Sequence, residues 1–246
     1  MDLLTGGLDP LAALTLLAVS FAGSFVTVTM GLGGGILVLA TMASLVPPAA
    51  LIPLHGVVQL GSNAVRAAVL LRHTHWPPVT GFALGALGGA ILGGQVAVEL
   101  PTGALQIAVG LFVLWSLVAQ PPRWLTRWPW LSGLVSTALT MFVGATGPFV
   151  ATMVRAFDLP RQSHVATHAV LMTLQHGLKI AVFGLLGFAF APWLGFLAAM
   201  IGAGALGTLL GRRVLLTMND RLFRLALNVV LAALSIRLIW SGINAL

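Results

Sequence analysis

Long apolar stretches, separated by short breaks, fill almost the whole chain. A helix needs about 20 apolar residues to cross a bilayer, and many of these stretches approach that length. Prolines interrupt the pattern at the breaks and tryptophans lie near the ends of the stretches, which is typical of helices that end at a membrane surface. The pattern predicts helical segments at 11–30, 34–46, 50–71, 78–98, 103–119, 130–143, 149–157, 164–186, 192–211 and 222–242.

The composition excludes a soluble globular protein. Of the 246 residues, 59% are hydrophobic and 7% are charged, and the mean hydropathy is +1.04. Soluble proteins carry about 25% charged residues. The formal net charge of +7 comes mostly from arginines at segment ends, which the positive-inside rule explains better than nucleic-acid binding does. We therefore expect an all-α integral membrane protein with about eight membrane segments and the lipid bilayer as its partner.

The charges of the loops predict how the segments cross the bilayer. Four loops are basic and are placed in the cytoplasm: 72–76, 120–130, 155–163 and 212–221. Two loops lack a basic residue and are placed outside: 99–102 and 187–191. Both termini then lie outside. The segments within 11–46 and within 130–157 must each begin and end on one side, as two spans or as a re-entrant hairpin bent at its glycines. In an alternative, the first segment of each pair spans fully and the second folds back.

One unit of sequence occurs twice, and its two copies have opposite predicted orientations. Without a gap, an offset of 113 residues aligns three polar pairs: His55 with His168, Asn63 with His176, and Arg66 with Lys179. The chain is thus predicted to hold two inverted-topology repeats, residues 1–120 and 121–246, of about four helical segments each. This architecture is typical of transporters that bind their substrate between the repeats.

A glycine-rich break lies near the start of each repeat and predicts a broken helix there. The first elbow contains Gly33, Gly34 and Gly35, and the second contains Gly144, Thr146, Gly147 and Pro148. A helix that restarts inside the membrane presents free N–H groups and its positive dipole end, which together favour an anion. The alternative is close helix packing. Packing is also the prediction for two sets of glycines at helical spacing: 81, 85, 88, 89 and 93, and 195, 202, 204, 207 and 211.

A polar stripe follows each elbow. The first stripe has the spacing 0, 4, 7, 8 and 11, which places it on one helix face: His55, Gln59, Ser62, Asn63 and Arg66. The second stripe repeats the spacing 0, 7, 8 and 11: His168, Gln175, His176 and Lys179. A cation inside a membrane needs water or a partner, and no acidic residue is near in sequence. We expect an external anion to be that partner.

Three alternatives remain for these side chains. Arg66 and Lys179 lie within reach of segment ends and could extend to the membrane surface. The histidines could be hydrogen-bonded structural residues. A catalytic or metal-binding role for the histidines is disfavoured, because no carboxylate accompanies them and the chain has no cysteine. We predict no cofactor, no metal and no enzymatic activity.

The G-x-G-G-G motif of residues 31–35, the Gly147-Pro148 elbow and the duplicated half resemble the sulfite exporter TauE/SafE family, also called the toluene sulfonate uptake permease family. The resemblance covers nearly the whole chain. It implies a small transporter of the inner membrane that moves sulfur-containing anions such as sulfite, sulfonates or sulfoacetate. By position, the resemblance assigns the family's two glycine elbows to Gly33, Gly34 and Gly35 and to Gly144, Gly147 and Pro148 of this chain. The first elbow has no proline close behind it, and the nearest is Pro47.

The sequence therefore predicts a secondary transporter of small sulfur-containing anions such as sulfite or organosulfonates in a bacterial inner membrane. Substrate would bind at the interface of the repeats, on the elbows and the two stripes. Export is favoured, because an inside-negative potential drives an anion outward by about 2.3 kcal/mol per charge per 100 mV. Two alternatives stay open: a membrane assembly protein without transport, and an uptake permease for another small anion. A homodimer also stays open.

Overall fold

The computed structural model describes residues 5–30, 33–97, 101–119, 127–214 and 221–246. Within these residues every element is helical and there is no strand. Ten α-helices are described: α2 (Pro10–Met30), α3 (Gly34–Leu45), α4 (Pro48–Leu70), α5 (Pro77–Ala97), α6 (Thr102–Val118), α8 (Pro129–Val143), α9 (Gly147–Arg155), α10 (Arg161–Leu185), α11 (Leu194–Val214) and α12 (Arg221–Ile243). Two 3₁₀ turns join them, η1 (Leu71–His73) and η2 (Ala191–Trp193).

Each predicted segment corresponds to one of these helices, with ends that differ by a few residues. Three helical stretches are long and apolar enough to cross a membrane, namely Pro10–Met30, Pro77–Gln95 and Ala191–Arg213. By contrast, α3 has 12 residues and α9 has 9, so they extend about 18 Å and 14 Å. Neither covers the roughly 30 Å of a bilayer core. Their lengths favour half-membrane helices that fold back against the helix before them.

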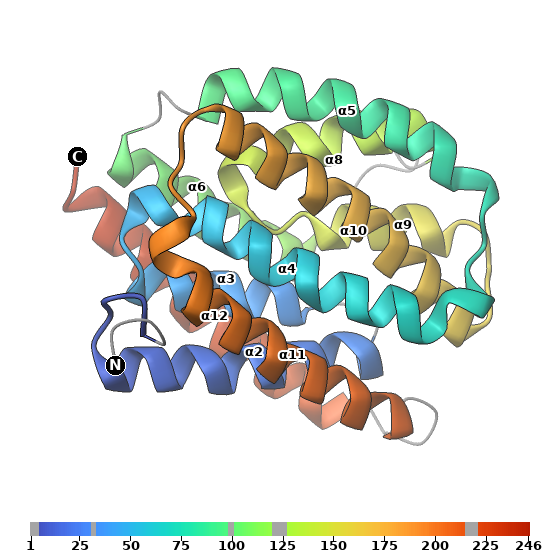
Figure 1. Ribbon diagram of the computed structural model, residues 1–246, viewed down its shortest axis with the longest axis horizontal. Coiled ribbons are helices and arrows are strands. Elements are labelled where there is room, and N and C mark those ends of the chain that lie inside the picture. Colours follow the sequence, from blue (N-terminus) through green and yellow to red (C-terminus); the bar gives the residue numbers. More distant parts are fainter. Residues whose placement is uncertain (1–4, 31–32, 98–100, 120–126, 215–220) are drawn as a thin grey trace.

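The helices lie roughly parallel and alternate in direction along the longest axis of the molecule. Both termini lie at the left end of Figure 1, together with the end of α5 and the start of α6. The loops at 74–76 and 156–160 lie at the right end, near the end of α11. That helix ends with Arg212 and Arg213 in its last turn. The fold thus gathers basic segments at one end and both termini at the other, as the predicted topology requires.

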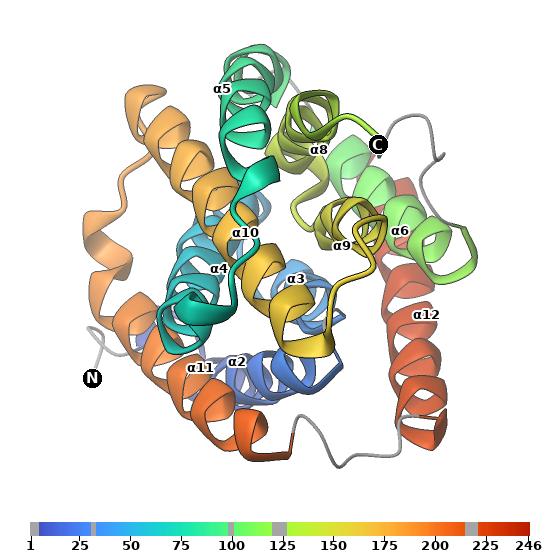
Figure 2. The ribbon, with the colours of Figure 1, turned by 90° about the vertical axis from the view of Figure 1, so that its right-hand side faces the viewer.

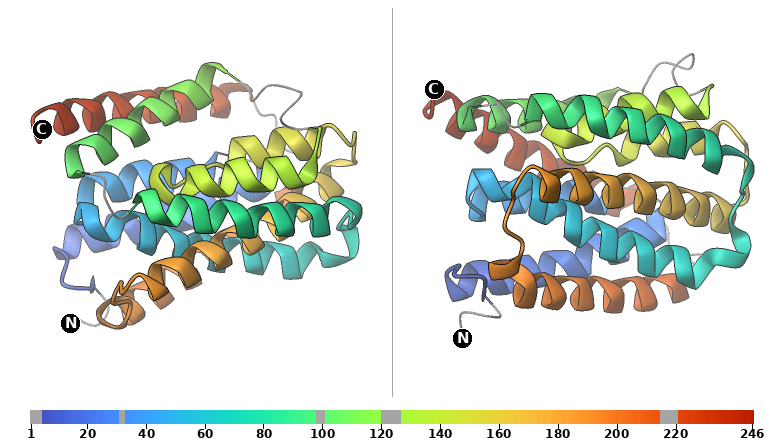
Figure 3. Two further views of the ribbon diagram at one scale, coloured as in Figure 1. Left: turned by 90° about the horizontal axis from the view of Figure 1, so that it is seen from above. Right: turned by 45° about the horizontal axis from the view of Figure 1, so that its top comes forward.

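Four helix pairs make the most extensive contacts: α5 with α8, α2 with α11, α4 with α10, and α6 with α12. Viewed along the helices, α4 and α10 occupy the middle of the molecule, between the α5–α8 pair and the α2–α11 pair (Figure 2). The pair α6–α12 forms one edge (Figure 3). The largest apolar core cluster contains much of α3, including Leu39 and Met42, and side chains of α4 such as Leu51 and Leu54. The two polar stripes therefore lie on the two most central long helices.

Glycines permit the closest of these contacts. A Cβ atom on Gly85 or Gly89 would collide with the backbone of α8 at Trp130 or Leu134, and one on Gly207 would collide with the backbone of α2 at Phe21. These three positions confirm the predicted packing role. Gly202, by contrast, has open space beside it. The sequence did not indicate which helix would be the partner, since only a three-dimensional fold brings α5 to α8.

Replacing Gly89 with alanine tests this packing. The new methyl group would meet the carbonyl of Leu134, so α5 and α8 must separate. We expect the free energy of unfolding to fall by about 1–3 kcal/mol, the usual cost of overpacking. The matched control is Gly202→Ala, also inside a helix, where alanine should be neutral or stabilising by about 0.5–1 kcal/mol. Melting of the purified protein in detergent measures both. Equal melting temperatures would contradict the packing account.

Candidate functional site

Two breaks inside the bundle form the elbows. The chain leaves α2 and enters α3 through Gly33, whose φ is 101°, and it leaves α8 through Gly144, whose φ is 85°. Both values lie in the left-handed region that side chains other than glycine rarely adopt. At Gly34 the backbones of α2 and α3 touch, because a Cβ atom there would collide with the carbonyl of Gly23. The first elbow therefore depends on glycine for both its conformation and its packing. Gly31, the first glycine of the motif, lies outside the described residues.

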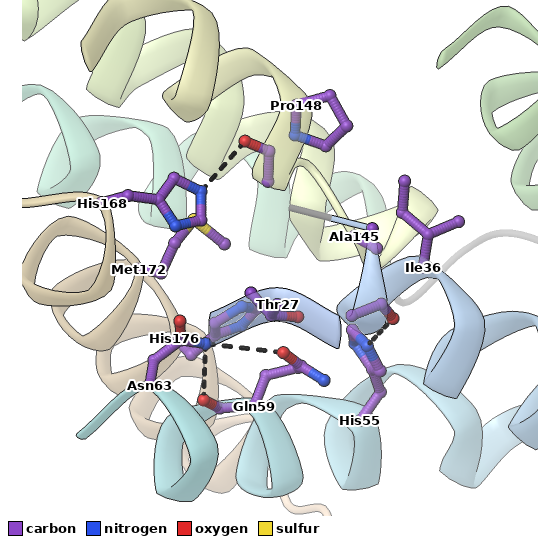
Figure 4. Close-up of a pocket in the computed structure, with 13 residues that line it drawn as sticks. Thr27, Ile36, His55, Gln59, Asn63, Ala145, Pro148, His168, Met172 and His176 are labelled. Atoms are coloured by element: carbon purple, nitrogen blue, oxygen red, sulfur yellow. Dashed lines mark hydrogen bonds between the residues drawn. The ribbon is translucent and has the colours of Figure 1, made fainter. Parts of the chain in front are cut away.

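A small cavity of about 30 Å³ lies where the two elbows meet the two stripes (Figure 4). Nine of the predicted site residues line it: Gly33, Gly35, His55, Gln59, Asn63, Gly147, Pro148, His168 and His176. Four further lining residues were not predicted: Thr27, Ile36, Ala145 and Met172. Met172 could have been found, because it stands 113 residues after Gln59, at the same position of the repeat. Ile36 and Ala145 offered no polar signal.

Two lining histidines hold the elbows in place. His55 Nε2 lies 3.0 Å from the carbonyl oxygen of Gly35, and His168 Nε2 lies 3.2 Å from that of Gly147. A carbonyl oxygen only accepts hydrogen bonds, so each Nε2 carries the hydrogen. These contacts fit the structural alternative for the histidines. The same two rings also face the cavity.

His176 differs from the other two histidines. It is 1% exposed and lines the cavity, yet no hydrogen bond joins its ring to another of the described residues. Its ring stands nearly perpendicular to that of His55, with 6.0 Å between the centroids. The Nδ1 atoms of both rings are buried and unpaired. The cavity therefore contains unused hydrogen-bonding capacity.

Arg66 is fully inside the protein and does not reach the membrane surface. It is 1% exposed. Its guanidinium donates to Asn63 Oδ1 at 2.8 Å and to Ser62 Oγ at 3.0 Å, and the Ser62 hydroxyl lies 2.7 Å from that of Ser24 on α2. Asn63 in turn donates to the carbonyl of Gln59 at 2.8 Å. Arg66 thus orients Asn63 from behind the cavity wall.

Lys179 is also completely buried. Its ammonium donates to the carbonyl of Gly144 at 3.1 Å and lies 3.4 Å from the carbonyl and the hydroxyl of Thr140. These groups belong to the C-terminal end of α8, where a cation interacts favourably with the helix dipole. The other broken helix, α2, is capped in a similar way: Arg161 of α10 donates to the carbonyl of Thr29 at the end of α2. Each broken helix therefore ends against a cation of α10.

Gln175 supports the second elbow. It donates to Thr146 Oγ1 at 2.8 Å and accepts from Ser136 Oγ at 3.0 Å, and Thr146 donates to the Ser136 carbonyl at 3.0 Å.

Six of the predicted site residues do not line the cavity: Gly34, Arg66, Gly144, Thr146, Gln175 and Lys179. Their partners Ser24, Ser136 and Thr140 were not predicted. The signal for the last two was the set of hydroxyl residues at helical spacing along α8 (Ser132, Ser136, Thr140).

A second, larger cavity of about 470 Å³ opens near the two termini. Its lining includes Asp9, Gln106 and Arg237 and none of the predicted site residues. Asp9 is engaged at the start of α2, where its carboxylate accepts from the backbone N–H of Leu11 at 2.9 Å. The described residues contain no group of three or more histidines, cysteines or acids that could hold a metal ion. The elbow cavity is therefore the place where the predicted polar residues converge.

The bundle of apolar helices around a polar centre defines the class of the protein as a multi-pass membrane protein. A family model described as sulfite exporter TauE/SafE matches residues 16–238. The chain therefore belongs to the sulfite exporter TauE/SafE family and is a membrane transporter, which confirms the resemblance seen in the sequence. This is a family of transporters and not of enzymes. Neither a curated protein nor a solved structure matches the chain significantly.

Replacing Gln175 with leucine separates a supporting role from contact with substrate. The change leaves buried hydroxyls of Ser136 and Thr146 without their amide partner, which should cost about 1–3 kcal/mol of stability even without ligand. The control is Thr173→Val, two residues away, where the lost hydroxyl donates only to the carbonyl of Ala169 on its own helix. Thermal melting without added anion measures both. A Gln175→Leu protein as stable as the control would contradict the supporting role.

Proposed function

We propose that this transporter moves small sulfur-containing anions such as sulfite or organosulfonates, and that the anion binds in the cavity between the two elbows. The observation that carries this proposal is the convergence of both elbows and both stripes on one small cavity. Family membership supports an anion as substrate. Family membership also argues against the alternative function, a membrane assembly protein without transport.

The size of the cavity favours a compact ligand. Its volume of about 30 Å³ corresponds to roughly two or three water-sized positions, because one water needs about 10–15 Å³ on this scale. An inorganic oxyanion such as sulfite is closer to this size than an organosulfonate with a long chain. A larger sulfonate would need the walls to move apart.

The cavity lining offers neutral hydrogen-bond donors and contains no charged side chain. The first turn of α3 has backbone N–H groups without partners inside its helix, and both α3 and α9 point the positive ends of their dipoles at the cavity. The first turn of α9 offers fewer donors, because Pro148 has no N–H and the Phe149 N–H donates to the Thr146 carbonyl at 3.0 Å. The Gln59 amide packs against the first turn of α3, since a Cβ atom on Gly35 would lie 3.0 Å from Gln59 Oε1. None of the lining residues is an arginine, lysine or acid. Neutral donors can hold an anion and still release it, as transport requires.

The two buried cations stand at opposite ends of the cavity. On each stripe the cation follows the lining histidines, and α4 and α10 run in opposite directions (Figure 1). Arg66 therefore lies toward the end with the basic loops, and Lys179 lies toward the end with the termini. Neither side chain lines the cavity. Each adds positive potential along one half of the route to the site.

We further propose that residues 1–120 and 121–246 are inverted repeats. Under the offset of 113, α2 and α3 correspond to α8 and α9, and α4 corresponds to α10. The close pair α5–α8 is then the counterpart of the close pair α11–α2, since the order of the helices pairs α5 with α11. Rocking of one repeat against the other would expose the cavity alternately to each side.

Export is the direction we favour, with the basic end of the bundle facing the cytoplasm of a bacterial cell. The inside-negative potential across the inner membrane drives anions outward, at about 2.3 kcal/mol per charge per 100 mV. Uptake would need a second driving ion. Uptake of another small anion is the alternative that the flux experiment below distinguishes.

A methyl group placed in the cavity tests the site. Gly147→Ala adds a Cβ atom 3.8 Å from His168 Nε2, an ordinary contact, so the protein should fold. The methyl group takes part of a very small cavity, and sulfite flux in proteoliposomes should fall by roughly tenfold or more, since a misplaced methyl group costs about 1–3 kcal/mol in a tight site. The control is Gly177→Ala, whose Cβ atom lies 3.9 Å from Leu60, away from the lining.

The same assay compares sulfite, methanesulfonate, sulfate and chloride. Flux of a sulfur-containing anion that Gly147→Ala removes and Gly177→Ala retains is the expected result. Unchanged flux in Gly147→Ala would place the site elsewhere. Flux of chloride alone in the unaltered protein would contradict the substrate class.

A further inference from the structure

The ring of His176 makes no hydrogen bond to another described residue, and its Nδ1 is buried and unpaired. His55 and His168 each donate Nε2–H to an elbow carbonyl, whereas His176 donates to none of the described residues and accepts from none of them. A buried polar group without a partner costs about 1–3 kcal/mol. Native proteins rarely keep such a group without a reason. A ligand in the cavity would supply the missing partner.

The neighbouring ring strengthens this point. Since Nε2 of His55 carries the hydrogen, its Nδ1 is a bare acceptor, and this atom is buried and unpaired like Nδ1 of His176. The two rings meet edge to face at 6.0 Å. A ring nitrogen that carries no hydrogen repels an anion through its lone pair, and it can take up a proton. A proton on His176 would turn both of its ring nitrogens into donors and place a positive charge beside the cavity.

We propose that His176 takes up a proton from water when the anion binds, so that the transporter carries anion and proton together. This inference rests on the proposed function of the cavity. The proton adds to the unprotonated ring nitrogen of His176, no other bond changes, and the imidazolium pairs with the bound anion. For a dianion such as sulfite, the pair keeps one negative charge, so the membrane potential still drives it outward.

The surrounding charges make the two binding events depend on each other. On its own helix His176 has Lys179 about one turn away and His168 about two turns away, and from α4 it faces His55. The lining residues of α2, α3 and α9 and all residues of α5 and α8 are non-titratable. Arg66 is engaged with Asn63 and Ser62, while Arg72, His73 and Arg155 lie in η1 or at the end of α9, outside the lining.

No carboxylate lines the cavity. A proton on His176 therefore adds a second positive charge near Lys179, with no negative charge to balance it until an anion arrives. By linkage, the anion raises the affinity for the proton, and the proton raises the affinity for the anion by the same factor.

Calorimetric titration of the purified transporter tests the inference. The probes are sulfite and methanesulfonate, and the second stays a monoanion at every pH used, so any proton must go to the protein. Titrations at one pH near 7.5 in buffers of different ionisation enthalpy give the number of protons taken up, and we expect about one per anion. The test variant is His176→Asn, which places at 176 the residue that already occupies the matching position 63. It should bind more weakly and take up almost none.

The control variant is His164→Asn on the same helix, outside the cavity lining. It should take up as many protons as the unaltered protein. As a second measurement that needs no variant, the affinity of the unaltered protein for methanesulfonate should fall by up to about tenfold per unit rise in pH. Proton uptake that persists in His176→Asn, or anion binding that is independent of buffer and pH, would overturn the inference and leave the proposed site intact. An unaltered protein that binds neither probe would overturn the proposed function itself.

Discussion

Helix ends inside a membrane are the constraint on which this structure depends. The bilayer core offers no water for the free backbone groups of a helix that stops there, and the two elbows create four such ends. The C-terminal ends of α2 and α8 are satisfied internally, by Arg161 on the carbonyl of Thr29 and by Lys179 on those of Thr140 and Gly144. The N-terminal ends of α3 and α9 have no such side-chain cap. In the proposed function, these two N-terminal ends face the bound anion.

The rest of the bundle holds the elbows at the centre. Glycines on α5 and α11 let these helices touch the backbones of α8 and α2, the two helices that lead into the elbows. The histidines of α4 and α10 then tie the first turns of α3 and α9 to the most central pair of helices. One set of contacts therefore fixes the outer walls and another fixes the cavity.

Much of this arrangement could be predicted from the sequence, because apolar length, breakers and the duplicated stripe are local signals. All ten α-helices of the described residues and nine of the lining residues were identified in this way. Side-chain direction could not be predicted. Lys179 lies one turn from His176 on the same face, but its long side chain reaches the end of α8 and not the cavity. The pairing of α5 with α8 was also hidden, because a glycine face shows that a partner exists and not which helix it is.

The position of a bound anion tests the central claim most directly. Selenite has the shape and charge of sulfite and scatters X-rays anomalously, so crystals of the transporter soaked in selenite would locate it. The account predicts one strong peak between the two elbows, within hydrogen-bonding distance of the first turns of α3 and α9 and of His176. A peak confined to the larger cavity beside Arg237, or to the surface, would show that the meeting point of the elbows is not the anion site.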